Sequence, residues 1–135
     1  MVYIDGWRGR IGLITPSPGS STESEFNRYR PEGVAVLTTR IPLLGISREA
    51  LERMNTYVND AASLLATAEV DAIVFACTAG TFLNGPGWDR EIIARLTRLT
   101  GKKITTTSTG VLEALAALNV KKVSVATPYA AAVNE

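Results

Sequence analysis

The feature that most constrains the fold is the alternation of short apolar runs with amphipathic stretches along the chain. Runs rich in β-branched and other apolar residues occupy residues 10–15, 34–38, 72–76, 103–107 and 122–127. Strands that alternate with helices are typical of a parallel sheet joined by crossover helices. We therefore predict an α/β fold, with one doubly wound parallel sheet in a single domain and helices on both of its faces.

The clearest helical pattern begins after the second run. Ser47 is the expected N-cap, and the helix should continue to about Ala66. Within it, apolar side chains recur every three or four residues and form one stripe: Leu51, Met54, Val58, Ala61 and Leu65. Such a stripe predicts a helix that packs on the sheet.

Weaker patterns predict the remaining helices. A short helix is expected within residues 22–31, and another should end at Gly101, a natural residue just past a helix C-terminus. Ser108 or Thr109 should cap a third, whose inward side chains are expected to be Val111, Leu112, Leu115 and Leu118. Pro128 can open a further helix, so we expect a domain over residues 1–127 and the start of a truncated helix over 128–135.

Composition excludes several classes of function. The 135 residues include 14 basic and 13 acidic side chains, which gives no sign of a nucleic-acid partner. Histidine is absent and there is one cysteine, so histidine-based catalysis and the usual zinc sites are excluded. No apolar run approaches the ~20 residues that span a bilayer, and residues 1–10 lack a signal-peptide core. We expect a cytoplasmic protein.

Polar side chains follow the predicted strands, at the sheet edge where ligands bind in such folds. They are hydroxyls and one thiol, without a carboxylate, and lie within residues 15–17, 77–81, 106–109 and 127–129. Hydroxyls and helix N-terminal N–H groups suit an anionic ligand. The candidate reacting group is Cys77, because free N–H groups at the start of a helix favour a thiolate.

Each candidate also has a purely structural interpretation. A free cysteine is often buried and inert, so Cys77 could be a core residue. Tyr129 could donate to a carboxylate or cover the edge of a pocket. The Thr and Ser residues at 105–109 combine β-propensity with a helix cap. Trp7 and Trp88 are interpreted as surface or interface packing rather than substrate contacts.

The order of motifs resembles one family. Residues 10–17 (RIGLITPS) are similar to its first strand and loop, and residues 75–82 (FACTAGTF) to its first cysteine segment. Residues 106–112 (TTSTGVL) and 121–129 (KKVSVATPY), with 133–135 (VNE), resemble its later motifs. The family is the maleate isomerase and arylmalonate decarboxylase branch of the aspartate/glutamate racemase superfamily, and the resemblance covers nearly the whole chain.

The resemblance implies a flavodoxin-like domain that forms one half of a pseudo-symmetric two-domain enzyme. It implies catalysis without cofactor or metal on a small carboxylate or dicarboxylate, with Cys77 as nucleophile or acid/base. In the isomerase, this cysteine is thought to attack the double bond and so allow rotation. The decarboxylase has glycine at the position of Cys77.

By the same motifs, Thr78 and Ala79 fall at anion-binding positions, Tyr129 at a tyrosine that holds a carboxylate, and Pro16 and Ser17 in the loop that lines the pocket. Where maleate isomerases typically carry an asparagine in that loop, this chain has Gly19. Three readings stay open: an isomerase or racemase, a decarboxylase-like lyase, and a half-domain that only binds ligand or self-associates. A homo-oligomer is expected.

Overall fold

The computed structural model describes residues 5–129 and contains a four-stranded parallel sheet. Its strands, in chain order, are β1 (Gly9–Pro16), β2 (Val34–Ile41), β3 (Ala72–Phe75) and β4 (Lys103–Thr106). In space their order is β2-β1-β3-β4. Because β2 lies on one side of β1 and the later strands on the other, the sheet is doubly wound, as predicted.

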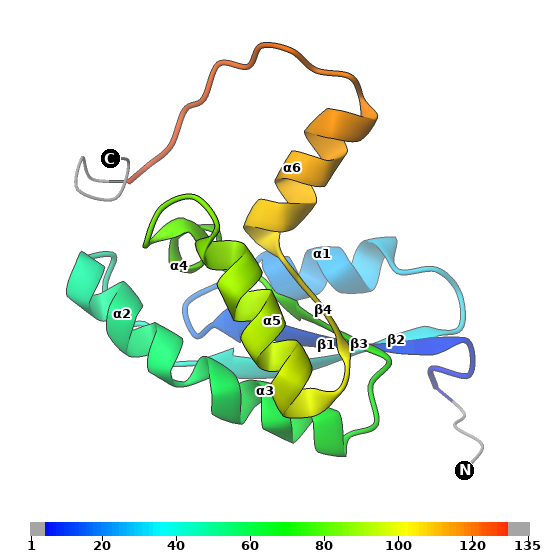
Figure 1. The fold of residues 1–135 in the computed structure, drawn as a ribbon. Helices are drawn as coiled ribbons and strands as arrows, with labels where there is room; N and C mark the ends of the chain where they lie inside the picture. Colours follow the sequence, from blue (N-terminus) through cyan, green and yellow to red (C-terminus); the bar gives the residue numbers. More distant parts are fainter. Residues whose placement is uncertain (1–4, 130–135) are drawn as a thin grey trace.

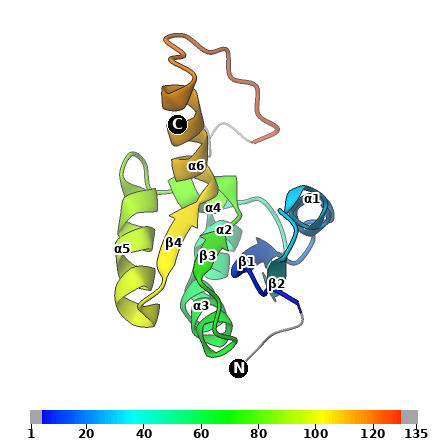
Figure 2. The ribbon, with the colours of Figure 1, turned by 90° about the vertical axis from the view of Figure 1, so that its right-hand side faces the viewer.

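Helices cover both faces of the sheet (Figure 2). They are α1 (Thr22–Tyr29), α2 (Arg48–Thr56), α3 (Val58–Thr67), α4 (Thr78–Phe82), α5 (Trp88–Thr100) and α6 (Thr107–Ala117). Helix α1 packs on β1 and β2 from one face, whereas α3 and α5 pack from the other. None of the helices in the described part of the chain is long and apolar enough to cross a membrane.

The main core lies between the sheet and α2, α3 and α5. Ile14, Ile73 and Phe75 point into it from the strands and are completely buried. The predicted stripe meets them from the helices, and all five of its residues are buried. The stripe is carried by two helices instead of one, because α2 ends at Tyr57. The Tyr57 N–H donates to the carbonyl of Met54, three residues earlier, at 3.1 Å.

The end of α5 is as predicted. Gly101 follows it in the left-handed conformation, with φ of 68°, and its N–H donates to the Thr97 carbonyl at 2.8 Å. Ile92 and Leu96 lie on the buried face of α5, whereas Leu99 near its end is exposed.

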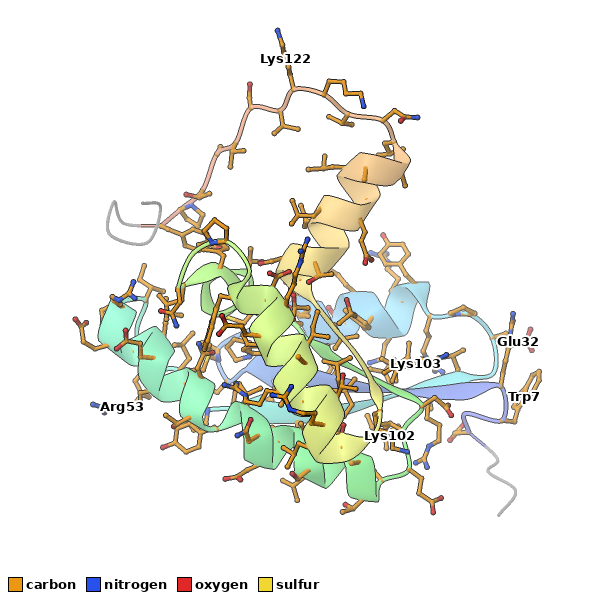
Figure 3. The ribbon with its side chains drawn as sticks, in the orientation of Figure 1. Trp7, Glu32, Arg53, Lys102, Lys103 and Lys122 are labelled. Atoms are coloured by element: carbon orange, nitrogen blue, oxygen red, sulfur yellow. The ribbon has the colours of Figure 1, made fainter. Side chains whose placement is uncertain are left out.

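The predicted packing of α6 and the predicted fifth strand are both wrong. Helix α6 points away from the carboxyl edge of the sheet (Figure 1), and Val111, Leu112 and Leu118 are exposed. Residues 122–127 run as irregular chain, and the Lys122 side chain points away from the molecule (Figure 3). A β-prone run becomes a strand only where a neighbouring strand pairs with it, and α6 carries this run away from β4.

The expected helix from Pro128 falls largely outside the described residues. Pro128 and Tyr129 are irregular, and positions 130–135 are not described. The proposed division into residues 1–127 and 128–135 therefore stays a prediction.

Candidate active site

The register of the sheet places three of the polar segments at one edge. Ile14 of β1 pairs with Phe75 of β3, which pairs in turn with Thr106 of β4. Pro16, Cys77 and Ser108 each lie two residues after this row, where the three segments leave the carboxyl edge. The expectation that the loops after β1, β3 and β4 meet at one edge therefore agrees with the observed pairing.

Cys77 links β3 to α4. Its backbone is extended, with φ of −146° and ψ of 99°, and its side chain is half-buried against the core. Burial raises the pKa of the Cys77 thiol, and the backbone N–H of Gly80 partly offsets this effect. The expectation that the start of the helix would favour the thiolate is therefore outweighed by desolvation, and α4 has only five residues to contribute.

Thr78 and Ala79 follow Cys77 in the first turn of α4. The Thr78 carbonyl accepts a hydrogen bond from the Thr81 hydroxyl at 3.0 Å, and Thr78 itself is half-buried. Ala79 is 9% exposed and its side chain belongs to the core. At Ala79 an anion could therefore use the backbone but not the side chain.

The loop after β1 is shaped by Arg40, which the sequence analysis did not single out. Its guanidinium donates to the Ser17 carbonyl at 3.0 Å and to the Gly19 carbonyl at 2.8 Å, and it pairs with Glu23 at 2.8 Å. This pair lowers the pKa of the Glu23 carboxyl. The Ser17 hydroxyl accepts from the Leu43 N–H at 3.2 Å, so the loop bearing Pro16 and Ser17 is held in place by β2.

Tyr129 lies beside α4. Its ring meets the Phe82 ring edge-on, with centroids 5.7 Å apart, and Tyr129 is half-buried against the core. The segment after α6 thus returns over the helix that Cys77 begins (Figure 1). The position is compatible with both interpretations of Tyr129, as a pocket edge and as a donor to a ligand.

Part-buried polar contacts join α6 to α4 and to α5. The Thr81 and Ser108 hydroxyls are 2.6 Å apart, and the Thr109 hydroxyl donates to the Asp89 carboxylate at 2.5 Å. Thr106, rather than Ser108 or Thr109, caps α6, and its hydroxyl accepts from the Thr109 N–H at 3.2 Å. The Thr and Ser cluster is therefore largely structural.

A groove of about 280 Å³ lies between α2, α3 and α5, and none of the predicted site residues lines it. Trp88 lines it, with the Arg95 guanidinium 5.8 Å from the ring centroid. Trp7 is 67% exposed and lies against Gly33, at the opposite edge of the sheet. Both tryptophans are thus packing residues in this structure, and Trp88 also lines a groove.

Among residues 5–129, no three acidic, histidine or cysteine side chains gather into a group that could hold a metal ion. The predicted site segments bring a thiol, hydroxyls and backbone N–H groups to the carboxyl edge, and the Arg40 guanidinium and the Asp89 carboxylate bond to these segments. Such a set can bind an anion and present a nucleophile next to it.

The chain is similar to maleate isomerases. It is 24% identical over 133 residues to the maleate isomerase of Geobacillus stearothermophilus, a match that covers 89% of this chain and 53% of that protein. The chain thus spans about half the length of the relatives it matches.

Solved structures agree on the fold. A variant of the maleate isomerase Iso from Pseudomonas putida S16, with maleate, superposes with a TM-score of 0.86 at 27% identity, over 93% of this chain and 55% of that one. A variant of the Nocardia farcinica maleate cis-trans isomerase with a covalently bound succinylcysteine intermediate gives 0.76 at 23% identity, over 82% of this chain and 49% of that one.

A family model also matches nearly the whole chain. The model of the arylmalonate decarboxylase family matches residues 11–135. The resemblance drawn from the motifs is therefore confirmed, and the chain belongs to the arylmalonate decarboxylase family, within the aspartate/glutamate racemase superfamily.

Proposed function

We propose that this protein is a cofactor-independent isomerase of a small dicarboxylate such as maleate, with Cys77 as the reacting thiol. One observation carries the proposal: Cys77 follows β3 at the carboxyl edge of the sheet, the edge at which the chain also leaves β1 and β4. The similarity to maleate isomerases, one of them solved with maleate, supports the choice of substrate.

The proposed reaction needs no net proton transfer. The Cys77 thiol first releases its proton to water. The sulfur then adds to one alkene carbon, and the electron pair of the double bond moves onto the carboxylate attached to the other alkene carbon. After rotation about the carbon–carbon single bond, the electron pair returns, the C–S bond breaks and the trans isomer leaves. The succinylcysteine in the similarly folded Nocardia protein supports a bond between sulfur and the substrate carbon.

The anionic substrate would be held by the groups around Cys77. We assign carboxylate binding to the Thr78 hydroxyl, the Ala79 N–H and the Tyr129 hydroxyl, with Pro16 and Ser17 lining the pocket. The observed neighbourhood supports this set, since Thr78 and Ala79 begin α4 and Tyr129 packs on Phe82 of the same helix.

The raised pKa of Cys77 gives the proposed reaction a pH dependence. Because the thiolate reacts and the thiol does not, turnover should rise with pH until the folded-state pKa is passed. A rate that falls over the same range would contradict a thiolate nucleophile.

The direct test is conversion of maleate to fumarate, followed by proton NMR. Cys77→Ala and Cys77→Ser should lose activity by about a thousandfold or more, as nucleophile variants do. Ser63→Ala, at a half-buried position of α3 outside the proposed site, is the control and should keep wild-type turnover. Equal turnover by Cys77→Ala and wild type would refute the role of Cys77, and an inactive wild-type chain would refute the isomerase proposal for this chain.

A decarboxylase-like lyase is the second candidate, because the matching family model is that of arylmalonate decarboxylase. It would release carbon dioxide from a malonate that bears an aryl group. Release from phenylmalonate, with no conversion of maleate, would favour the lyase over the isomerase.

The third candidate is a half-domain that binds ligand or self-associates without catalysis. The exposed apolar residues of α6 support self-association: Val111 is 50% exposed and Leu112 60%. We extend the proposal to a cytoplasmic homo-oligomer. Sedimentation over a range of concentrations tests the oligomer, and a monomer at every concentration would contradict it.

A further inference from the structure

Gly80 is the residue at which the groove between α2, α3 and α5 meets the Cys77 segment. Its carbonyl oxygen accepts two hydrogen bonds, both of 3.1 Å, one from the Asn55 side-chain amide and one from the Trp88 indole N–H. Asn55 lies on α2 and Trp88 begins α5. Side chains from two separate helices therefore donate hydrogen bonds to one carbonyl in the turn that follows Cys77.

The other side of Gly80 faces the sulfur. Its backbone N–H favours the Cys77 thiolate, although the thiol makes no side-chain cap hydrogen bond to α4. The approach is close: a β-carbon added at Gly80 would lie 3.3 Å from the Cys77 sulfur and 2.6 Å from the Met54 methyl. The Gly80 backbone thus lies close against the Cys77 sulfur.

Asn55 carries a feature that points to a role beyond stability. Its side-chain oxygen is buried and has no hydrogen-bond partner. An unpaired buried acceptor is unfavourable, and an apolar side chain of the same size would avoid it. The amide is nevertheless oriented so that its donor reaches the Gly80 carbonyl.

We propose that Asn55 and Trp88 are positioning residues that hold the Gly80 carbonyl from two helices and thereby aim the Gly80 N–H at the Cys77 sulfur. The proposal rests on the proposed function insofar as Cys77 must react as a thiolate. Its mechanism is local: an N–H held near the sulfur stabilises the thiolate more than the thiol, and so counteracts the effect of burial.

The test uses Asn55→Leu, which keeps the size of the side chain and removes its donor, and Trp88→Phe, which keeps an aromatic ring and removes the indole N–H. Both substitutions exchange uncharged residues, so the charges around Cys77 stay unchanged. Asn59→Ala is the matched control, because Asn59 lines the same groove and is exposed. The measurement is the rate of Cys77 alkylation by iodoacetamide against pH, on the full chain.

Each single variant should lower the alkylation rate at pH 8 about threefold, and the double variant about tenfold. The tenfold decrease corresponds to a rise of about one unit in the thiol pKa. Asn59→Ala should match wild type. Asn55→Leu should unfold at the wild-type temperature or above, because it also removes the unpaired oxygen, so a purely structural role would not reproduce the pattern.

An alkylation profile unchanged in both folded variants would overturn the proposal. If Trp88→Phe fails to fold, Asn55→Leu alone decides, since its profile either shifts or does not. Alkylation requires no turnover of a dicarboxylate. An inactive wild-type chain would therefore refute the proposed function, while the alkylation profiles would still decide whether Asn55 and Trp88 act on Cys77.

Discussion

Replacing Gly80 by alanine tests the packing around the candidate site. The added methyl would lie 2.6 Å from the terminal methyl of Met54, 3.2 Å from the Asn55 side-chain oxygen and 3.3 Å from the Cys77 sulfur. Met54 is completely buried, so its methyl cannot move into solvent. The substitution must therefore shift a packed side chain or the backbone of α4.

The net cost follows from two opposing effects. Overpacking of this kind typically costs about 1–3 kcal/mol, while alanine in place of a helical glycine gains about 0.5–1 kcal/mol. The free energy of unfolding should fall by about 1–2 kcal/mol, which for a chain of this size corresponds to a decrease in Tm of roughly 3–8 °C.

Gly110→Ala is the control for Gly80→Ala. Gly110 also lies within a helix, α6, but a β-carbon there would meet nothing within 4 Å. Gly110→Ala should therefore raise the free energy of unfolding by about 0.5–1 kcal/mol. Thermal and urea unfolding followed by circular dichroism measure both variants. A Gly80→Ala protein as stable as Gly110→Ala would refute the packing described around Cys77.

Three further predictions concern single contacts. Burial raises the folded-state pKa of Cys77, so the stability this thiol contributes is fully present below its unfolded pKa of about 8.5 and is lost as the pH rises through the folded pKa. Wild type should lose stability relative to Cys77→Ala over that range, and parallel pH–stability curves would contradict this. Thr109→Val leaves the buried Asp89 carboxylate without its 2.5 Å donor and should cost about 1–3 kcal/mol in urea unfolding; an unchanged midpoint would contradict it. Arg40→Met removes both guanidinium hydrogen bonds to the loop at Ser17. Because these bonds are part-exposed, their loss should lower the free energy of unfolding by about 1 kcal/mol and speed proteolytic cleavage in that loop. An unchanged cleavage rate would contradict the role of Arg40 in holding the loop.

The elements that could be predicted from sequence are those whose signal is local. The stripe from Leu51 to Leu65 is a spacing within one stretch, and all its members are buried. The end of α5 at Gly101 depends on one residue that adopts the left-handed conformation, with φ of 68°. The meeting of the loops after β1 and β3 follows from parallel pairing alone, which the register of Ile14 with Phe75 confirms.

The features that could not be predicted depend on contacts between distant residues. Residues 122–127 have strand-like composition, but a strand also needs a partner, and α6 leads them away from β4. The direction of the Cys77 pKa shift depends on burial, which the local sequence does not reveal. Arg40 holds carbonyls 21 and 23 positions earlier in the chain, and only its place at the end of β2 hinted at such a role.

The central claim is that Cys77 is a reacting group beside a binding site for a small dicarboxylate. The most direct test is the rate of Cys77 alkylation against pH, measured with and without maleate. We expect a rate that climbs with pH through a midpoint above the ordinary thiol range and that falls when maleate is present. The same rate with and without maleate at every pH would contradict the claim and identify Cys77 as a structural residue of the core.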